Sequence, residues 1–219
     1  MSVRVKICGI TTPEQALMVQ DAGADLLGLV IYNKSSRYVD VQRAVQIRRV
    51  IRPPVQCVAL LVNADAEFVH NVIDQVKPDL LQFHGDESPL FCQQFDVPFI
   101  RAIRMRKGLD VDAEVRAYDA PAGVLFDAWS EDHYGGTGHQ FDWARLPCAE
   151  AMPKGTTLIL AGGLTSDNVA DAVRLVGPNV VDVSGGVESA PGVKDLNKVR
   201  AFIRNAKNAH PKIASDPAL

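Results

Sequence analysis

The sequence predicts an α/β fold, a single closed (β/α)8 TIM barrel, from three observations. Short apolar runs that read as strands alternate with helical patterns eight times along the 219 residues. A chain of about 200 residues is the lower limit for such a barrel. The rival fold is an open doubly wound sheet, which often carries G-x-G-x-x-G after its first strand. This chain has Cys8-Gly9-Ile10-Thr11 there, so we expect the barrel.

The expected strands are near-continuous apolar runs, as in a parallel sheet covered by helices. They span Val3–Cys8, Asp25–Tyr32, Val55–Asn63, Asp79–His84, Phe99–Met105, Gly123–Ala128, Thr157–Gly162 and Val180–Ser184. The helices between and after them are expected at Pro13–Ala22, Asp40–Ile51, Ala64–Val76, Ser88–Phe95, Val111–Tyr118, Asp142–Ala151, Ser166–Val176 and Leu196–Ala209. The pattern over Val111–Tyr118 is the least regular of the set.

Local signals support several of these helix ends. Thr12 precedes Pro13, which is a capping residue followed by proline at the first helical position, and Gly23 follows the last turn of that helix. Asn63 and Asp65 favour a helix start after the third strand. No linker divides the chain, so we expect one barrel domain over residues 1–209. Residues 210–219 have no periodicity and are expected to form a flexible tail.

Composition excludes several classes of function. The net charge is −3, and no basic block suggests nucleic acid or a membrane surface. No apolar run approaches the roughly 18 residues of a membrane span. The first strand begins at once, which leaves no room for a signal peptide. Four scattered cysteines show no metal-ligand or disulfide spacing. We therefore expect a cytoplasmic protein with no metal, no nucleic-acid partner and no membrane partner, and the choice between monomer and homodimer stays open.

Polar side chains stand where the predicted strands end, which is where barrels build their active sites. Alternation places Lys6 and Cys8 on one face of the first strand. The same rule pairs Gln82 with His84 and Asp182 with Ser184. The other polar residues at these ends are Asp127 after the sixth strand and Arg37 in the loop after the second.

Glycine pairs follow the last two strands. Gly162-Gly163 follows the seventh, and Ser184-Gly185-Gly186 follows the eighth. Barrels commonly bind phosphate with these two loops, because glycine lets backbone N–H groups approach the anion. One glycine pair would more simply be a turn, but two at successive strand ends favour phosphate. A further stretch, Gly135-Gly136-Thr137-Gly138, lacks the P-loop ending and is expected to be a flexible loop over the ligand.

Each candidate residue also has a purely structural interpretation. Isolated cysteines are more often packing residues, and Cys57, Cys92 and Cys148 are assigned that role. Cys8 differs because it ends a strand, shares a face with Lys6 and precedes a glycine. Asp127 at the end of an apolar strand is costly unless paired, which favours function. For His84 and Arg37, a structural role and a site role remain equally open.

The chain resembles the phosphoribosylanthranilate isomerase family of tryptophan biosynthesis. The resemblance is carried by motifs that run in the family's order along nearly the whole chain. They are Lys6-Ile7-Cys8-Gly9-Ile10-Thr11, Ser35-x-Arg37, Gln82-Phe83-His84-Gly85, Asp127, Gly135-Gly136-Thr137-Gly138 with Phe141-Asp142-Trp143, Ala161-Gly162-Gly163-Leu164, and Ser184-x-Gly186-Val187-Glu188 with Pro191-Gly192-x-Lys194-Asp195.

The resemblance implies an Amadori rearrangement of N-(5′-phosphoribosyl)anthranilate to the 1-deoxyribulose aminoketose phosphate. By the family pattern, Asp127 would be the general acid and Cys8 the general base. Arg37 would hold the anthranilate carboxylate, and Asp182, His84 and Gln82 would lie near the substrate. Gly162, Gly163, Ser184, Gly185 and Gly186 would hold the phosphate. The reaction moves protons and not hydride, so no cofactor is expected. A thiol base needs a lowered pKa, which Lys6 is expected to provide.

Two positions depart from the family pattern. Ser36 stands where the family usually has proline, and Gly185 stands where it usually has a second serine. Both changes are expected to affect substrate binding and neither touches the acid or the base. Three rivals remain: a Schiff-base aldolase with Lys6 as nucleophile, a flavin-dependent barrel, and an inactive sugar-phosphate-binding barrel. Indole-glycerol-phosphate synthase is disfavoured because strand Val55–Asn63 carries no lysine.

Overall fold

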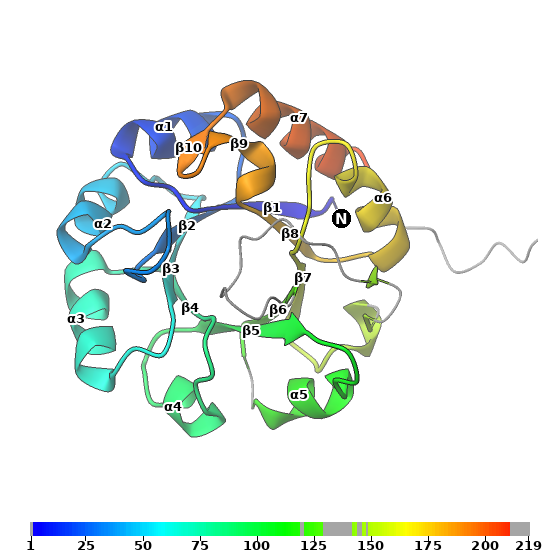
Figure 1. Ribbon diagram of the computed structural model, residues 1–219, viewed down its shortest axis with the longest axis horizontal. Coiled ribbons are helices and arrows are strands. Elements are labelled where there is room, and N and C mark those ends of the chain that lie inside the picture. The colour runs from blue at the N-terminus through cyan, green and yellow to red at the C-terminus, as the bar shows by residue number, and fades with distance from the viewer. Residues whose placement is uncertain (1, 119–120, 129–141, 144–145, 148, 211–219) are drawn as a thin grey trace, which may run out of the picture.

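The computed structural model describes residues 2–118, 121–128, 142–143, 146–147 and 149–210. Eight parallel strands form a closed ring with helices around it, as Figure 1 shows. In chain order these strands are β1 (Arg4–Cys8), β2 (Leu26–Val30), β3 (Gln56–Leu61), β4 (Leu80–Phe83), β5 (Phe99–Met105), β6 (Gly123–Ala128), β7 (Thr157–Leu160) and β8 (Val180–Val183). The predicted barrel is confirmed.

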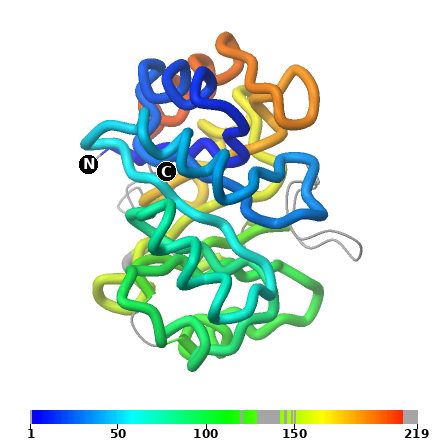
Figure 2. The backbone as a smooth tube through the Cα atoms, turned by 90° about the vertical axis from the view of Figure 1, so that its left-hand side faces the viewer, coloured from blue at the N-terminus to red at the C-terminus, as the bar shows by residue number. Residues whose placement is uncertain are grey.

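The barrel closes by pairing its first strand with its last. Lys6 of β1 lies opposite Asp182 of β8 in the register, and Cys8 lies opposite Gly28 of β2. Figure 2 shows the N-terminal segments, in blue, beside the C-terminal segments, in orange and red. This closure brings residues from the two ends of the chain to one site.

The helices cover the outside of the ring. They are α1 (Pro13–Asp21), α2 (Val41–Arg48), α3 (Ala66–Val76), α4 (Pro89–Gln93), α5 (Val111–Ala117), α6 (Val169–Val176) and α7 (Leu196–Lys207). Thr12 and Asp65 cap α1 and α3 through their side-chain oxygens, as the sequence predicted. None of the helices in these described ranges is long and apolar enough to cross a membrane.

The core has two layers that follow strand alternation. Outward-facing residues such as Val5 and Ile7 of β1 pack in the cluster between strands and helices. Inward-facing residues such as Leu26, Val58 and Leu125 fill the barrel interior. Lys6 and Cys8 also point inward, so an ammonium and a thiol replace apolar side chains on this strand.

The helix predicted over Asp142–Ala151 is wrong. Among its described residues, Trp143 and Ala149–Ala151 have 3-10 and not α-helical conformation, and the latter form the segment η2, while residues 144, 145 and 148 lie outside the described part. Leu146 N–H donates to Trp143 O in a turn. Pro147 explains the difference, because proline lacks the N–H that a helix needs and disfavours helical geometry in the residue before it. The expected tail also lies outside the described residues beyond His210.

A short hairpin after β8 was not predicted. The 3-10 turn η3 (Gly185–Val187) leads into β9 (Glu188–Ala190), which pairs antiparallel with β10 (Val193–Lys194) before α7 begins. The strands are only two or three residues long, so they carry little periodic signal.

Candidate active site

One pocket of about 340 Å³ opens at the carboxyl ends of the barrel strands. Every residue that the sequence singled out for the site lines it. These are Cys8, Arg37, Gln82, His84, Asp127, Gly162, Gly163, Asp182, Ser184, Gly185 and Gly186, joined by apolar neighbours that include Val30, Tyr32 and Leu60. A thiol from β1 and a carboxyl from β6 therefore face one cavity, although they are far apart in the sequence.

A buried ion pair lies beneath the thiol. Lys6 is fully buried, and its Nζ is 3.0 Å from Oδ1 of Asp182. Burial by itself would lower the pKa of the Lys6 ammonium, but Asp182 and Cys8 outweigh burial and raise this pKa above its ordinary value. Lys6 therefore stays charged, which does not suit the neutral amine that a Schiff-base nucleophile requires.

The expectation that Lys6 lowers the pKa of Cys8 below its ordinary value is wrong for the protein without substrate. Burial raises the pKa of the Cys8 thiol, and Lys6 and Lys194 offset this only in part. The position of the lysine was predicted correctly, but the desolvation of a thiol that is 5% exposed is the larger effect.

Space for the thiol comes from Gly28 on the neighbouring strand. A Cβ at position 28 would lie 2.7 Å from Sγ of Cys8, closer than real contacts allow. Sequence reasoning missed this residue. A glycine inside an otherwise apolar strand was its only signal, because such a glycine often marks a close approach.

The other described cysteines behave as packing residues. Cys57 and Cys92 are buried and unpaired. Burial raises the pKa of each to about 12, so both stay protonated near neutral pH. Cys148 lies outside the described residues.

The carboxyl side of the pocket holds Asp127, His84 and Gln82, all of them buried. Nε2 of Gln82 is 2.8 Å from Nδ1 of His84, and Nε2 of His84 is 3.2 Å from Oδ2 of Asp127. The His84–Asp127 contact lacks hydrogen-bond geometry, so Nε2 of His84 is left without a partner among the described residues, as is Oε1 of Gln82. The backbone N–H of Ala128 donates to Oδ1 of Asp127 at 2.8 Å. Among the described residues, the backbone N–H of Ala128 thus donates to the carboxyl, while polar atoms of Gln82 and His84 stay available to a ligand.

Glycine turns form the rim of the pocket next to Asp127, where a Cβ at Gly162 would lie 3.2 Å from Oδ1 of Asp127. Gly162 and Gly163 have φ of +82° and +64°, values that favour glycine. A Cβ at Gly162 would meet the backbone N of Ala128 at 2.7 Å, and a Cβ at Gly186 would overlap the carbonyl oxygen of Leu164. These positions require glycine because the loop after β7 touches the end of β6 and the loop after β8 touches the loop after β7. The Gly135–Gly138 loop lies outside the described residues.

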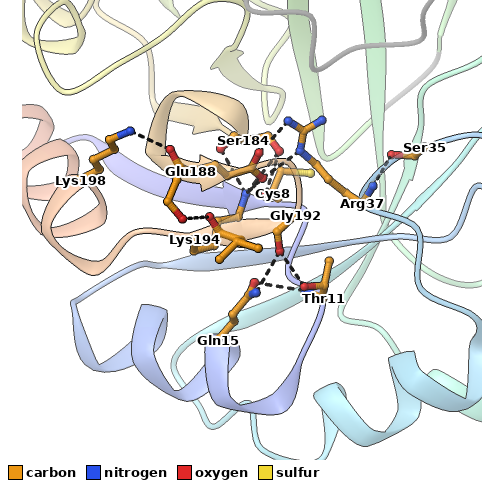
Figure 3. Close-up of polar contacts among 12 residues, drawn as sticks. Cys8, Thr11, Gln15, Ser35, Arg37, Ser184, Glu188, Gly192, Lys194 and Lys198 are labelled. Carbon is orange, nitrogen blue, oxygen red and sulfur yellow. Dashed lines mark hydrogen bonds and ion pairs between the residues drawn. The ribbon is translucent and has the colours of Figure 1, made fainter.

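A charged cluster joins Arg37 to the hairpin after β8 (Figure 3). Nε and Nη2 of Arg37 donate to Oε1 and Oε2 of Glu188 at 2.9 and 2.8 Å. Nζ of Lys194 lies 2.6 Å from Oε1 of the same carboxylate and 3.2 Å from the carbonyl oxygen of Ser184. Glu188 and Lys194 were noted only as parts of a motif, and charged residues just after the last strand were the available signal.

Within the described ranges, no group of three or more histidine, cysteine, aspartate or glutamate side chains is arranged to hold a metal ion. The pocket presents a free thiol, carboxyl groups, an imidazole, a guanidinium and the backbone N–H groups of glycines. Such groups move protons and bind anions.

A closed parallel barrel with this pocket at its strand ends is a TIM-barrel enzyme for a small-molecule substrate. The model of one family, N-(5′-phosphoribosyl)anthranilate (PRA) isomerase, matches residues 5–205. The chain belongs to this family.

Individual relatives agree with the family model. The N-(5′-phosphoribosyl)anthranilate isomerase of Neisseria gonorrhoeae is 48% identical over 204 residues, which cover 93% of this chain and 96% of that protein. The one of Pseudomonas paraeruginosa is 50% identical over 202 residues, or 92% of this chain and 94% of that protein.

Solved structures give the same result. The crystal structure of phosphoribosyl anthranilate isomerase from Thermotoga maritima is 36% identical and superposes with a TM-score of 0.84 over 94% of this chain and 98% of that chain. A second phosphoribosyl anthranilate isomerase, in complex with reduced 1-(o-carboxyphenylamino)-1-deoxyribulose 5-phosphate, gives a TM-score of 0.81 at 35% identity with the same coverage.

Proposed function

We propose that this chain isomerises N-(5′-phosphoribosyl)anthranilate by general acid–base catalysis, with Asp127 as the acid and Cys8 as the base. The reaction is that of the family, an Amadori rearrangement to 1-(2-carboxyphenylamino)-1-deoxyribulose 5-phosphate in tryptophan biosynthesis. The observation that carries the mechanism is that Cys8 and Asp127 line one pocket together with two glycine turns.

The first step opens the sugar ring. Asp127 gives its proton to the ring oxygen, the bond from that oxygen to C1 breaks, and the nitrogen lone pair forms the Schiff base. An acid in this role must hold a proton until the substrate arrives. Asp127 lines the pocket, where its carboxyl can reach the ring oxygen of a bound sugar, and this placement supports the assignment.

The second step removes the proton from C2. The thiolate of Cys8 accepts it, and the electron pair moves to give an enolamine, which tautomerises to the ketone as C1 gains a proton and the C2 hydroxyl loses one. Return of a proton from the thiol to Asp127 through solvent restores the enzyme. Lys6 and Lys194 favour the thiolate, while burial opposes it, so the base must form with substrate bound or at raised pH.

Binding contacts are proposed at both ends of the substrate. Arg37 holds the anthranilate carboxylate, a planar anion suited to a guanidinium. Backbone N–H groups of Gly162, Gly163 and the Ser184–Gly186 turn hold the phosphate. Asp182, Gln82 and His84 bind between these ends, where the unpartnered Gln82 Oε1 and His84 Nε2 would accept from and donate to sugar hydroxyls.

The test is a fluorescence assay that follows loss of the anthranilate substrate in the wild type, Cys8→Ala and Asp127→Asn. Each variant is expected to lose a factor of at least about 10² in kcat, the usual scale for a general acid or base. Cys57→Ala is the matched control and should keep full activity. Unchanged rates in both site variants would end the mechanism.

We also propose the wider setting of the enzyme. The Thermotoga maritima relative is described as a dimeric enzyme from which monomers have been generated, so monomer and homodimer are both proposed here. Sedimentation velocity at micromolar concentration would decide between monomer and homodimer.

The three described cysteines are free thiols, which favours the reducing cytoplasm, and cell fractionation tests this.

We propose that the barrel domain spans residues 1–209. Deletion of residues 210–219 should then leave thermal stability unchanged.

A further inference from the structure

Glu188 occupies one edge of the Arg37 guanidinium and leaves another edge available. The Nε–Nη2 edge donates to both oxygens of Glu188. A guanidinium has a second bidentate edge, formed by Nη1 and Nη2, that can hold a second carboxylate in the same plane. Arg37 lines the pocket, so a carboxylate bound there would meet a guanidinium whose orientation is already set.

The charges of the cluster suit one more anion. Arg37 and Lys194 bring two positive charges to the single carboxylate of Glu188, whose side chain is 4% exposed. An excess positive charge at a half-buried site is unfavourable until an anion neutralises it. Burial lowers the pKa of Lys194, Glu188 opposes this, and Arg37 lowers the pKa further, which agrees with such an excess.

The side chain of Arg37 reaches Glu188 by crossing over Gly9. A Cβ at position 9 would lie 2.6 Å from Cδ of Arg37 and 2.9 Å from Oγ of Ser184, and Gly9 has φ of +77°. The absence of a side chain at Gly9, which directly follows β1, therefore lets the Arg37 side chain pass close to Cys8. The path of the arginine and the position of the thiol depend on the same turn.

Hydrogen bonds to backbone carbonyl oxygens also hold the hairpin that carries Glu188 in place. Nζ of Lys198 donates to the carbonyl oxygen of Glu188 at 2.7 Å. Oγ1 of Thr11 and Nε2 of Gln15 donate to the carbonyl oxygen of Gly192 at 2.8 and 3.0 Å. Figure 3 shows Lys198 approaching Glu188 from the side away from Arg37. A tethered carboxylate can hold an arginine in one orientation at little entropic cost.

We propose that Glu188, held by Lys194, is a positioning residue that orients Arg37 to receive the carboxylate of the substrate. This rests on the proposed role of Arg37. A purely structural ion pair between the loop after β2 and the hairpin would use the same contacts, but it would not depend on whether the substrate carries a carboxylate.

The experiment compares two substrates in four proteins. The substrates are N-(5′-phosphoribosyl)anthranilate and the same compound with aniline in place of anthranilate. The proteins are wild type, Glu188→Gln, Arg37→Ala and the double variant. Glutamine keeps the shape of Glu188 but replaces one carboxylate oxygen with NH2. An NH2 in place of Oε2 loses the hydrogen bond from Nη2 of Arg37, and an NH2 in place of Oε1 loses those from Nε of Arg37 and Nζ of Lys194.

We expect Glu188→Gln to raise KM for the carboxylated substrate about 10-fold, with kcat changed less than about 3-fold. KM for the aniline compound should change less than about 2-fold. Arg37→Ala should raise KM for the carboxylated substrate by about 10- to 100-fold, and the double variant should be no worse than Arg37→Ala. Glu188→Asp, which keeps the charge, should recover part of the loss.

Arg174→Met is the matched control, because it removes a cation from an exposed ion pair with Asp171 on α6, away from the hairpin, and its KM should match the wild type. If Arg37→Ala raises KM but Glu188→Gln does not, or if the two effects multiply, the positioning role is wrong while the function of Arg37 stands. If Arg37→Ala leaves KM unchanged, the carboxylate assignment fails and the positioning role falls with it. Equal losses on both substrates would show a structural ion pair only.

Discussion

Cys8 and Asp127 face the same pocket, but the groups around them differ in charge. Lys6, Lys194, Asp182 and Glu188 form ion pairs around the thiol side. The carboxyl side has His84, Gln82 and a backbone N–H. A base that must carry a negative charge is helped by cations, whereas a lysine or arginine beside the acid would favour loss of its proton. The two sides of one barrel mouth thus suit opposite halves of a proton transfer.

The largest effect is expected from breaking the buried ion pair on the thiol side. Lys6→Met leaves Asp182 as an uncompensated buried carboxylate and should lower the free energy of unfolding by about 3–5 kcal/mol. Urea unfolding followed by circular dichroism measures this. Arg174→Met, which breaks the exposed pair with Asp171, is the control and should cost under about 1 kcal/mol. A similar small loss for Lys6→Met would show that the pair is not needed for the fold.

A second change displaces the thiol and leaves its charges in place. Gly28→Ala puts a Cβ against Sγ of Cys8, so we expect kcat to fall about 10²-fold, the scale of a 1 Å misplacement. Steady-state kinetics and a thermal melt separate this from unfolding. In a Cys8→Ala background the same substitution should cost nothing further. A multiplicative loss there would mean that Gly28 acts on something other than the thiol.

The carboxyl side is tested at His84. His84→Gln removes the imidazole next to Asp127 together with the proposed donor to a sugar hydroxyl, so kcat should fall about 10-fold and KM should rise. Steady-state kinetics with the carboxylated substrate gives both constants. A raised KM with full kcat would leave His84 its contact with the sugar and show that the ring does not position the acid.

The smallest expected effect is a shift in pH dependence. Burial raises the pKa of Cys8 and Lys194 lowers it, so kcat/KM should rise with pH as the thiol loses its proton. Lys194→Met removes a cation that favours the thiolate, and the midpoint of this rise should move to higher pH. Lys198→Met should leave the midpoint in place. A midpoint that stays or moves down in Lys194→Met would remove Lys194 from the surroundings of the base.

Strand alternation predicted much of the site correctly in position. Lys6 and Cys8 share one face of their strand, and so do Gln82 and His84, because side-chain direction alternates from residue to residue along a strand. The location of the site residues at the strand ends follows from the barrel fold, which is predicted from the order of strands and helices alone. The helix predicted over Asp142–Ala151 is wrong because Pro147 interrupts the apolar pattern and cannot donate the N–H that a helix needs there.

The sequence by itself determined the class of fold and which polar side chains stand at the strand ends, because both depend on short-range periodicity. Only the tertiary structure decided that Gly28 faces Cys8, that Arg37 meets Glu188 and Lys194, and that burial outweighs Lys6 at the thiol. These depend on strand register, on barrel closure between β1 and β8, and on exclusion of water, none of which is encoded within a few residues of the groups concerned.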